Sequence, residues 1–554
     1  MNATVQFIPH GIAVPVATGT RLIDAARAAG IRVETPCDGA GTCGKCKAKI
    51  NQGALHPRGE EHEGLTQTER EAGWVLACQA VIQGDLQVEM ASTSNDGLRI
   101  ISEGQSLTVE LDPWIRKSFD AAAGITRVLA GDSVIATEPG DTTGRLFGMA
   151  IDIGTTTLVS TLLDLCTGQE LGLTSSLNPQ ARHAQDVLSR IKLGSKSEGL
   201  RKLHGELIEE LSRHAAYLAA KAGIAVAEIY EAIFSGNTTM LHLATATDPS
   251  SLGKFPYHLN LQGGTHVPAR EIDLRISEHG VVYLPPIMSA YVGPDITSGI
   301  LSADLANQSG TTLLVDIGTN GEIVLSVDGQ LTATSTAAGP AFEGMNIVCG
   351  MRASRGAVEL VQLGDDGVRV ETIAGAEPVG ICGSGLLDVV GELASQGGLD
   401  KNGRFLNNGA SHDKPWRDQW ETVDGRPAFR IAGPVYLTQK DVRQVQLAKG
   451  AIRTGIDMLL KANHLDASQV DRVLIAGSFG FHLRTSNLIH LGLLPSGFGD
   501  RVEFVGNTSK SGAQAFLLNW HTREKMKDIV AEVNILELAN DPAFEKAFVK
   551  SLQF

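Results

Sequence analysis

Two copies of one short polar motif place the strongest constraint on how this chain can fold. Residues 150–158 read AIDIGTTTL, and residues 314–324 read LVDIGTNGEIV. In each copy an apolar run reaches an aspartate, then a glycine, and then side chains with hydroxyl or amide groups. This pattern predicts a buried strand, a tight turn and a second strand, so we expect each copy to form a hairpin with a polar tip.

The two tips have the chemistry of a nucleotide site. Gly154 and Gly318 let the backbone approach a ligand closely, and the amide and hydroxyl groups beside them can hold phosphate oxygens. Asp152 and Asp316, each at the end of a strand, are suited to hold Mg²⁺ directly or through water. One tip alone is about as well explained as an ordinary turn, whereas two copies predict a duplicated fold with a nucleotide between its halves.

The overall charge and the cysteine content narrow the class of protein. The formal net charge of -15 disfavours binding to nucleic acid or to anionic membranes, because both reward positive charge. The first residues lack a basic region followed by an apolar run, and no apolar stretch is long enough to span a bilayer, so we expect neither a signal peptide nor a membrane span. Four of the seven cysteines lie near the N-terminus, which predicts a metal or cluster site in a reducing cytoplasm rather than a disulfide framework.

The four N-terminal cysteines have the spacing of an iron–sulfur loop. Cys37, Cys43 and Cys46 follow a C-x5-C-x2-C pattern, and Cys78 stands alone further along the chain. Four thiolates with three in one loop suit a 2Fe–2S cluster. Structural zinc is the alternative, but zinc sites usually pair short cysteine spacings on both sides. Residues 1–92 therefore resemble a ferredoxin of the β-grasp type.

The rest of the chain divides into a connecting region and one long α/β core. Residues 91–97 are rich in Ser, Asn, Asp and Gly and predict a linker. Residues 93–145 are expected to hold this linker and a shortened middle region with strand-like pieces. From residue 146 to residue 554 the α/β pattern is continuous, and we expect two lobes, at about 146–310 and 311–554. The remaining cysteines are expected to be buried structural thiols: Cys166, Cys349 and Cys382.

Several further polar segments stand out in the core. Residues 234–240 place a polar turn after a short apolar strand and are a candidate part of the cleft. The Gly-rich segments 339–344 and 380–388 lead into helices, and residues 473–480 are expected to form a strand followed by a Gly-rich turn. Asn178-Pro179-Gln180 and residues 186–191 lie between the first hairpin and an expected helical run at 200–222. A rigid turn at residues 292–295 is expected to start a helix near Asp295. Helix N-termini after such turns attract anions, although each segment taken singly is more easily explained as a plain turn.

The cysteine loop and the two Asp-x-Gly-Thr hairpins together resemble a known family. The hairpins resemble the phosphate-1 and phosphate-2 motifs of the superfamily that holds acetate and sugar kinases, heat-shock chaperones and actin. A 2Fe–2S ferredoxin joined to such a core resembles the reductive activators of corrinoid proteins. The resemblance implies a multidomain α/β protein, with an N-terminal β-grasp ferredoxin followed by a duplicated ribonuclease-H-like ATPase core. Family members with a separate middle domain have a longer insert than residues 99–145 allow.

The resemblance also implies roles for individual residues. Asp152 and Asp316 would organise Mg²⁺, and either Glu322 or Glu343 would orient an attacking water, with no choice between them from the sequence. The segment at Gly477 would pack against the adenosine. The groups that would hold ATP are Gly154, Thr155, Thr156, Thr157, Gly236, Asn237, Thr238, Gly318, Thr319, Asn320, Gly339, Gly477, Ser478 and Gly480.

A reductive activator would pass one electron from its cluster to a corrinoid protein and return inactive Co(II) to Co(I), driven by ATP. The implied partners are that corrinoid protein and an external electron donor. The oligomeric state is left open, and a homodimer is one possibility. An oxygenase reductase would need flavin and nicotinamide sites, for which the sequence offers no convincing strand–GxGxxG–helix unit. A small-molecule kinase would have no use for a cluster. The main alternative is an ATP-binding redox-sensing or electron-transfer module with no corrinoid partner.

Overall fold

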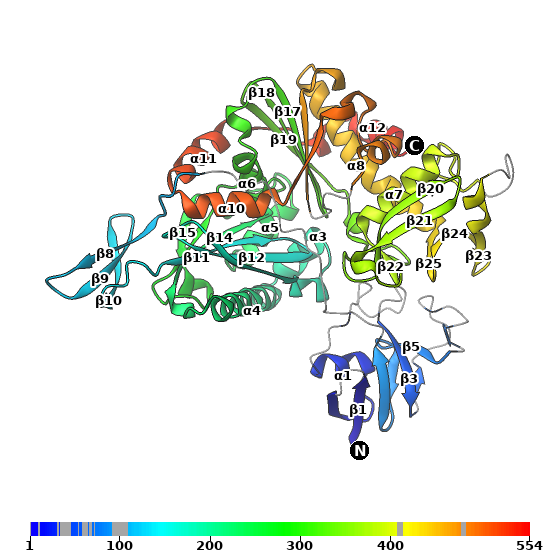
Figure 1. The fold of residues 1–554 in the computed structure, drawn as a ribbon, viewed down its shortest axis with the longest axis horizontal. Helices are drawn as coiled ribbons and strands as arrows, with labels where there is room; N and C mark the ends of the chain where they lie inside the picture. The colour runs from blue at the N-terminus through cyan, green and yellow to red at the C-terminus, as the bar shows by residue number, and fades with distance from the viewer. Residues whose placement is uncertain are drawn as a thin grey trace.

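The computed structural model describes most of the chain, with gaps around the cysteine loop and the linker. The described residues are 2–8, 12–29, 33, 46–53, 55–57, 65, 69–70, 72–90, 109–406, 414–477 and 483–554. The predictions made for Cys37, Cys43, Ser478, Gly480 and the linker at residues 91–97 therefore lie outside the described residues. Figure 1 shows an N-terminal domain, a small projecting sheet and two large lobes.

The N-terminal domain is built on a mixed five-stranded sheet of order β2-β1-β7-β3-β5. Strand β1 pairs with β2 in antiparallel and with β7 in parallel register, and helix α1 packs against the sheet through the buried Leu22 and Ile23. A mixed sheet crossed by one helix confirms the predicted β-grasp domain. Its elements are β1 (Asn2–Ile8), β2 (Ile12–Ala17), α1 (Leu22–Ala28), β3 (Lys47–Gln52), β4 (Leu55–Pro57), β5 (Trp74–Leu76), β6 (Ala80–Ile82) and β7 (Leu86–Met90).

A small antiparallel sheet lies between the N-terminal domain and the core in the sequence. It consists of β8 (Ile115–Asp120), β9 (Ile125–Ala130) and β10 (Ser133–Pro139), and it projects from the side of the first lobe in Figure 1. Ile115 and Val128 are fully buried and join the hydrophobic cluster that runs through the core. The strand-like pieces predicted in the shortened middle region therefore form a sheet that leans on the first lobe.

The first lobe is a six-stranded sheet of order β13-β12-β11-β14-β16-β15. Strand β11 pairs with β12 in antiparallel and with β14 in parallel register, and α4 covers the sheet with a row of buried apolar side chains. Its elements are β11 (Phe147–Ile153), β12 (Thr157–Asp164), β13 (Glu170–Leu177), α3 (Val187–Gly194), α4 (Ser197–Ala222), β14 (Ile229–Gly236), α5 (Thr238–Ala244), β15 (Thr265–Pro268), β16 (Val281–Leu284) and α6 (Pro294–Ser302).

The second lobe repeats this topology with a sheet of order β27-β26-β17-β18-β19-β28. Strand β17 pairs with β18 in antiparallel and with β26 in parallel register, just as β11 pairs with β12 and β14. This repetition confirms the predicted duplicated core. The elements of its sheet and the helices around it are β17 (Thr311–Ile317), β18 (Gly321–Val327), β19 (Gln330–Thr336), α8 (Gln439–Ala462), β26 (Arg472–Gly477), α9 (Thr485–His490), β27 (Val502–Gly506), α10 (Thr508–Leu518), α11 (His521–Glu532), β28 (Asn534–Ile535) and α12 (Phe544–Ser551).

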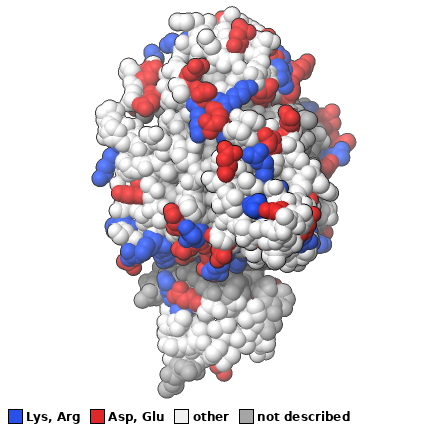
Figure 2. Space-filling model, turned by 90° about the vertical axis from the view of Figure 1, so that its left-hand side faces the viewer, with Lys and Arg blue, Asp and Glu red and all other residues white. Residues whose placement is uncertain are grey.

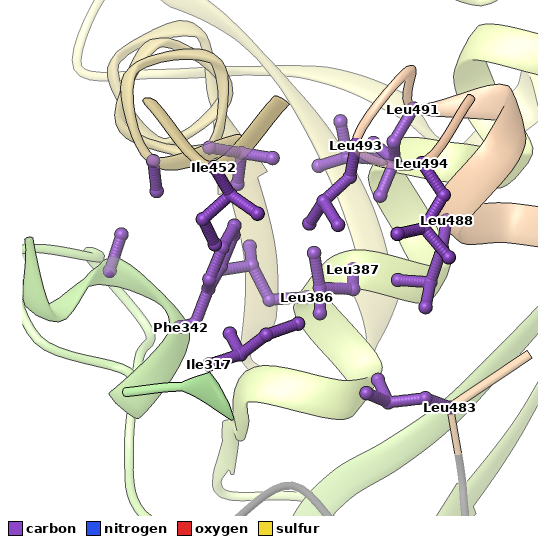
Figure 3. Packing of buried hydrophobic residues seen from close by; sticks show 14 of the residues in the cluster. Ile317, Phe342, Leu386, Leu387, Ile452, Leu483, Leu488, Leu491, Leu493 and Leu494 are labelled. Atoms are coloured by element: carbon purple, nitrogen blue, oxygen red, sulfur yellow. The ribbon is translucent and has the colours of Figure 1, made fainter. Parts of the chain in front are cut away.

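Two small sheets and one helix are inserted in the second lobe between β19 and α8. They are β20 (Ala357–Gly364), β21 (Gly367–Thr372), β22 (Gly380–Ile381), α7 (Gly383–Ser395), β23 (Trp420–Val423), β24 (Arg426–Ala432) and β25 (Val435–Thr438). Figure 3 shows Leu386 and Leu387 of α7 packed against Ile317 at the end of β17 and Phe342. Burying one aliphatic or aromatic side chain of this size stabilises the fold by roughly 1.5–3 kcal/mol, so the insertion helps to fix the end of β17 next to the tip of the second hairpin.

Helices α6 and α10 cross where the two lobes meet. Each follows an equivalent strand, β16 in the first lobe and β27 in the second, and they pack closely against each other. The contact depends on Gly512, because a Cβ atom there would lie only 2.1 Å from the carbonyl oxygen of Ser298. Their N-terminal ends consequently reach the space between the two hairpins.

Three further predictions concern the surface charge, membrane spans and the cysteines of the core. On the face shown in Figure 2, basic and acidic side chains are interspersed rather than gathered by sign. Within the described ranges, the helices include none with the length and apolarity that crossing a bilayer requires.

Cys382 is buried as predicted and Cys349 is partly buried, but Cys166 is exposed, so the prediction of a buried thiol at Cys166 was wrong. Cys166 lies in the turn between β12 and β13, where the neighbouring Leu165 enters the core and leaves Cys166 at the surface.

Candidate functional site: the cleft between the two hairpins

The two predicted hairpins are present and their tips meet. In the first, Ile153 pairs with Leu158, and in the second, Ile317 pairs with Gly321, so each turn is short. A Cβ atom at Gly154 would lie 2.5 Å from the carbonyl oxygen of Thr157, which explains why glycine occupies this turn. The Oγ1 atoms of Thr156 and Thr319 are 3.3 Å apart, so the duplication brings the two polar tips face to face.

A cavity of about 180 Å³ opens beside this meeting point. The sequence-predicted residues that line it come from both lobes: Asp152, Gly154, Thr155, Thr156, Thr157, Asn237, Asp316, Gly318, Thr319, Asn320, Glu322, Glu343 and Gly477. Three other predicted residues, Gly236, Thr238 and Gly339, are not among the residues that line it. Gly236 instead packs on the backbone of Ile153, and Thr238 donates to the carbonyl oxygen of Ser289 at 2.6 Å.

Four neighbouring carboxyl groups line the cleft, those of Asp152, Asp295, Asp316 and Glu322. Burial, and then the neighbouring carboxyl of Asp316, raise the pKa of Asp295 to about 8. Burial, and then the carboxyl of Asp152, raise the pKa of Asp316 to about 7. Burial, and then the carboxyl groups of Asp295 and Asp316, raise the pKa of Glu322 well above its usual range. Several acidic groups that raise one another's pKa values in a buried site create a demand for a bound cation.

Asp152 differs from the other carboxyl groups because side chains donate hydrogen bonds to both of its oxygens. Asn507 Nδ2 donates to its Oδ2 at 2.8 Å, and the Ser509 hydroxyl donates to its Oδ1 at 2.7 Å. Burial raises the pKa of Asp152, and these two bonds oppose that shift. Within the described ranges the acidic groups do not form a ready-made metal cage. Such a site suits Mg²⁺, which commonly uses one or two carboxylates and takes its remaining ligands from water and phosphate.

Glu343 lies apart from this group and faces the second tip. Its Oε1 accepts a hydrogen bond from the Thr319 hydroxyl at 2.6 Å. Its Oε2 is buried and has no hydrogen-bond partner among the residues that the structure describes. A buried carboxylate oxygen without a partner is costly, so this atom is available to a ligand or a water in the cleft.

The described part of the cysteine site brings two of the four predicted ligands together. Cys46 precedes β3 and Cys78 follows β5, and these two strands pair through Lys47 and Leu76. The N–H group of Ala77 donates to the carbonyl oxygen of Cys46 at 2.8 Å, so the two cysteines lie at the same end of this strand pair. Both are buried, at 1% and 2% exposure, which fits thiolates that hold a cluster inside the protein.

Three family models match consecutive parts of the chain. A 2Fe-2S iron-sulfur cluster binding domain matches residues 6–83, the RACo middle region matches residues 147–308, and the C-terminal domain of RACo, the ASKHA domain, matches residues 310–554. The solved structure of a reductive activator for corrinoid, iron-sulfur protein is 31% identical, with a TM-score of 0.74, over 100% of this chain and 98% of its own. The chain belongs to the family of reductive activators of corrinoid proteins.

Curated relatives of this activator support the assignment. The corrinoid activation enzyme RamQ of Eubacterium limosum is 28% identical, with 98% of this chain and 97% of the relative covered. The [Co(II) methylated amine-specific corrinoid protein] reductase of Methanosarcina barkeri is 24% identical, with 74% and 77% covered. The predicted combination of a 2Fe–2S ferredoxin with an actin-like ATPase core is confirmed.

The activator's cleft also contains residues that the sequence analysis did not assign to it. They are Asp295, Met351, Arg352, Ser384, Asn507 and Ser509, among others. A signal existed for two of them. Residues 506–509 read GNTS and repeat the GNTT of residues 236–239, and in both an asparagine caps the helix that follows a strand. Asp295 was placed at a helix start but not in the site, because only the crossing of α6 and α10 carries it there.

Proposed function

We propose that this chain is an ATP-dependent reductive activator that returns the Co(II) of a corrinoid protein to Co(I). The observation that carries the proposal is the match over the whole chain to a reductive activator, which includes both the ferredoxin and the ATPase core. Co(II) gains one electron and becomes Co(I), and the 2Fe–2S site loses one. An external donor then restores that electron.

ATP is needed because the electron moves uphill. For a one-electron step, every 59 mV or so against the reaction lowers the equilibrium constant about tenfold. Nucleotide can shift such an equilibrium only if two protein states differ in their affinity for the partner or in how they treat its cobalt. Two lobes that meet at their hairpin tips supply such states, because a nucleotide bound between Thr156 and Thr319 must change how the lobes meet.

We assign the cleft residues as follows. Asp316 and Glu322 would hold Mg²⁺ from the second lobe, and Asp152 and Asp295 would face it from the first. Bound Mg²⁺ would neutralise phosphate charge. Glu343 is our choice for orienting the attacking water, because its Oε2 is buried without a described partner while Thr319 holds its Oε1. Gly477, with Ser478 and Gly480, would contact the adenosine.

We further propose that four cysteines hold the cluster and that the chain works as three parts. Cys37, Cys43, Cys46 and Cys78 would bind one 2Fe–2S cluster, which would supply electrons singly. Residues 1–92 would be the ferredoxin, residues 93–145 the connecting region, and residues 146–554 the ATPase, with its lobes divided near residue 310. The partners would be a corrinoid protein and an external reductant, and the protein would work in the cytoplasm.

The deciding experiment is an anaerobic assay with a corrinoid protein from the same genome. The full chain, a chemical reductant and MgATP should produce the Co(I) absorbance, and omitting ATP should leave the corrinoid largely as Co(II). Cys43→Ser should bind ATP yet produce no Co(I), whereas Asp152→Ala should keep a reducible cluster but lose the ATP-driven step. Equal Co(I) formation without ATP, or with Cys43→Ser, would contradict the proposal and favour an electron-transfer module instead.

A further inference from the structure

Arg190 is a fully buried arginine directly behind the first hairpin tip. It lies on α3, its exposure is 0%, and it does not line the cleft. Its Nη2 donates to the carbonyl oxygen of Thr155 at 2.5 Å, its Nε donates to Ala184 O at 3.0 Å, and its Nη1 donates to Gln180 Oε1 at 3.0 Å. The segments at residues 178–180 and 186–191, which had no role in the sequence analysis, thus converge on the tip.

Two asparagines hold the same tip from other directions. Asn178 Nδ2 donates to the carbonyl oxygen of Gly154 at 2.9 Å, and Asn237 Nδ2 donates to the Thr155 hydroxyl at 2.9 Å. Arg190 Nη1 also contacts the sulfur of Met240 at 3.1 Å, on the helix that Asn237 caps. The tip is therefore tied to α3, to the turn after β13 and to α5 at once.

These bonds determine which way the backbone of the tip points. In a trans peptide the C=O and N–H groups point in opposite directions. When Asn178 and Arg190 hold the carbonyls of Gly154 and Thr155 behind the tip, the N–H groups of Thr155 and Thr156 point away from them, toward the cleft that these residues line. Neither N–H group donates to any residue in the described part of the chain. Adjacent free amides of this kind form an anion-binding surface.

The described partners of the Arg190 guanidinium are neutral groups. Within the described ranges, no carboxylate lies at ion-pair distance from the guanidinium, although Asp186 and Glu343 are near enough to act on it. Burial lowers the pKa of Arg190 to about 9, against the effect of these two acids. A buried cation without a counterion is unfavourable. An anion on the other side of the Thr155 peptide would supply the missing negative charge.

We propose that Arg190 is a positioning residue for the nucleotide phosphates, which turns the Thr155 and Thr156 amides toward them and attracts them with its buried charge. The inference rests on the proposed nucleotide site and adds to it how the first hairpin recognises phosphate. Lysine cannot replace this role fully, because one ammonium group cannot bridge three acceptors held in the planar geometry of a guanidinium.

The test compares three variants and one control variant of the full chain by calorimetric binding of MgATP, MgADP and adenosine, with ATPase kinetics alongside. Arg190→Gln should weaken MgATP binding tenfold or more, which corresponds to about 1.4 kcal/mol, and leave adenosine binding within about twofold. Arg190→Lys keeps the charge, so its MgATP affinity should stay within about threefold of wild type while kcat falls roughly tenfold. Asn178→Ala should weaken MgATP binding less than Arg190→Gln. Arg213→Gln, at an exposed arginine of α4 that pairs with Glu210, is the matched control and should match wild type.

The outcomes distinguish a failure of the role proposed for Arg190 from a failure of the proposed nucleotide site. Arg190→Gln that binds MgATP as tightly as wild type overturns the role of Arg190, and so does a parallel loss of adenosine and MgATP affinity, which would indicate general damage to the fold. If Arg190→Gln does not fold, the split between affinity and kcat in Arg190→Lys decides, and unchanged kcat there overturns the role. A wild-type chain that binds no MgATP contradicts the proposed function itself.

Discussion

The two hairpins carry nearly the same residues, yet their surroundings differ. In the first lobe, Asp152 accepts hydrogen bonds from Asn507 and Ser509, and the turn after it is held by Asn178 and Arg190. In the second lobe, Asp316 has no hydrogen-bond donor among the residues that the structure describes, and it shares a buried space with other carboxyl groups. The carboxylate and the backbone of the first hairpin are held by hydrogen bonds before any ligand binds, whereas the ionised form of Asp316 lacks such support.

This difference indicates a division of labour within a duplicated site. Hydrogen bonds favour the ionised form of a carboxyl group, and nearby like charges disfavour it. The first tip is therefore ready to receive an anion, and the second becomes fully ionised only when a cation joins it. Mg-nucleotide supplies both: its phosphates are the anion that the first tip can receive, and its Mg²⁺ is the cation that the second tip requires.

The largest effect is expected from the second aspartate. Asp316→Asn removes a carboxylate that we assign to Mg²⁺, so kcat for ATP hydrolysis should fall on the order of 100-fold, as for other losses of transition-state charge stabilisation. Ser509→Ala removes one of two hydrogen bonds to Asp152 and should lower kcat only about threefold to tenfold. Steady-state kinetics over a Mg²⁺ titration, with the cluster spectrum as a folding control, measure both. Equal losses in the two variants would contradict the division of labour.

A smaller effect is expected where the tips touch. Thr319→Val removes the hydroxyl that donates to Glu343 at 2.6 Å, and kcat should fall roughly tenfold because the proposed water-orienting carboxylate loses its anchor. Thr156→Val loses only the longer contact at 3.3 Å and should change kcat about threefold or less. The two isosteric variants control for each other. A reversed order of effects would show that the first tip, not the second, positions the reacting groups.

The smallest effect concerns pH and stability without ligand. Asp295 and Asp316 have folded-state pKa values of about 8 and about 7, above their usual range, so the folded state holds protons that the unfolded state releases. Their contribution to stability is therefore fully present at acid pH and is lost as pH rises through about 7 to 8. The melting temperature without Mg²⁺ should fall by roughly 2 °C or more between pH 6 and pH 9.

Two variants and one ligand sharpen this measurement. Asp295→Asn should flatten the decline, whereas Asp304→Asn, at an exposed aspartate outside the cleft, should leave its slope unchanged. MgADP should also flatten it, because bound Mg²⁺ favours the ionised carboxylates. A decline that persists unchanged in Asp295→Asn would mean that groups outside the cleft cause it.

Much of the fold followed from local patterns in the sequence. The alternation of apolar runs with glycine turns located β11–β12 and β17–β18, and cysteine spacing predicted the ferredoxin domain that Cys46 and Cys78 help to frame. The exposure of Cys166 was mispredicted, because burial of a turn residue depends on whether another element happens to cover it.

The sequence by itself determined the elements whose cause lies within a few residues: a strand, a tight glycine turn, a polar tip, and the repetition of all three. Only the tertiary structure decided which distant groups complete the site. Asp152 and Asn507 are 355 residues apart, and Thr155 and Arg190 are 35 apart, yet each pair is joined by a hydrogen bond. Asp295 reaches Asp316 only because α6 and α10 can cross at Gly512. Hydrogen bonds and charges act over a few ångströms in space, so these partners became visible only once the two sheets were assembled.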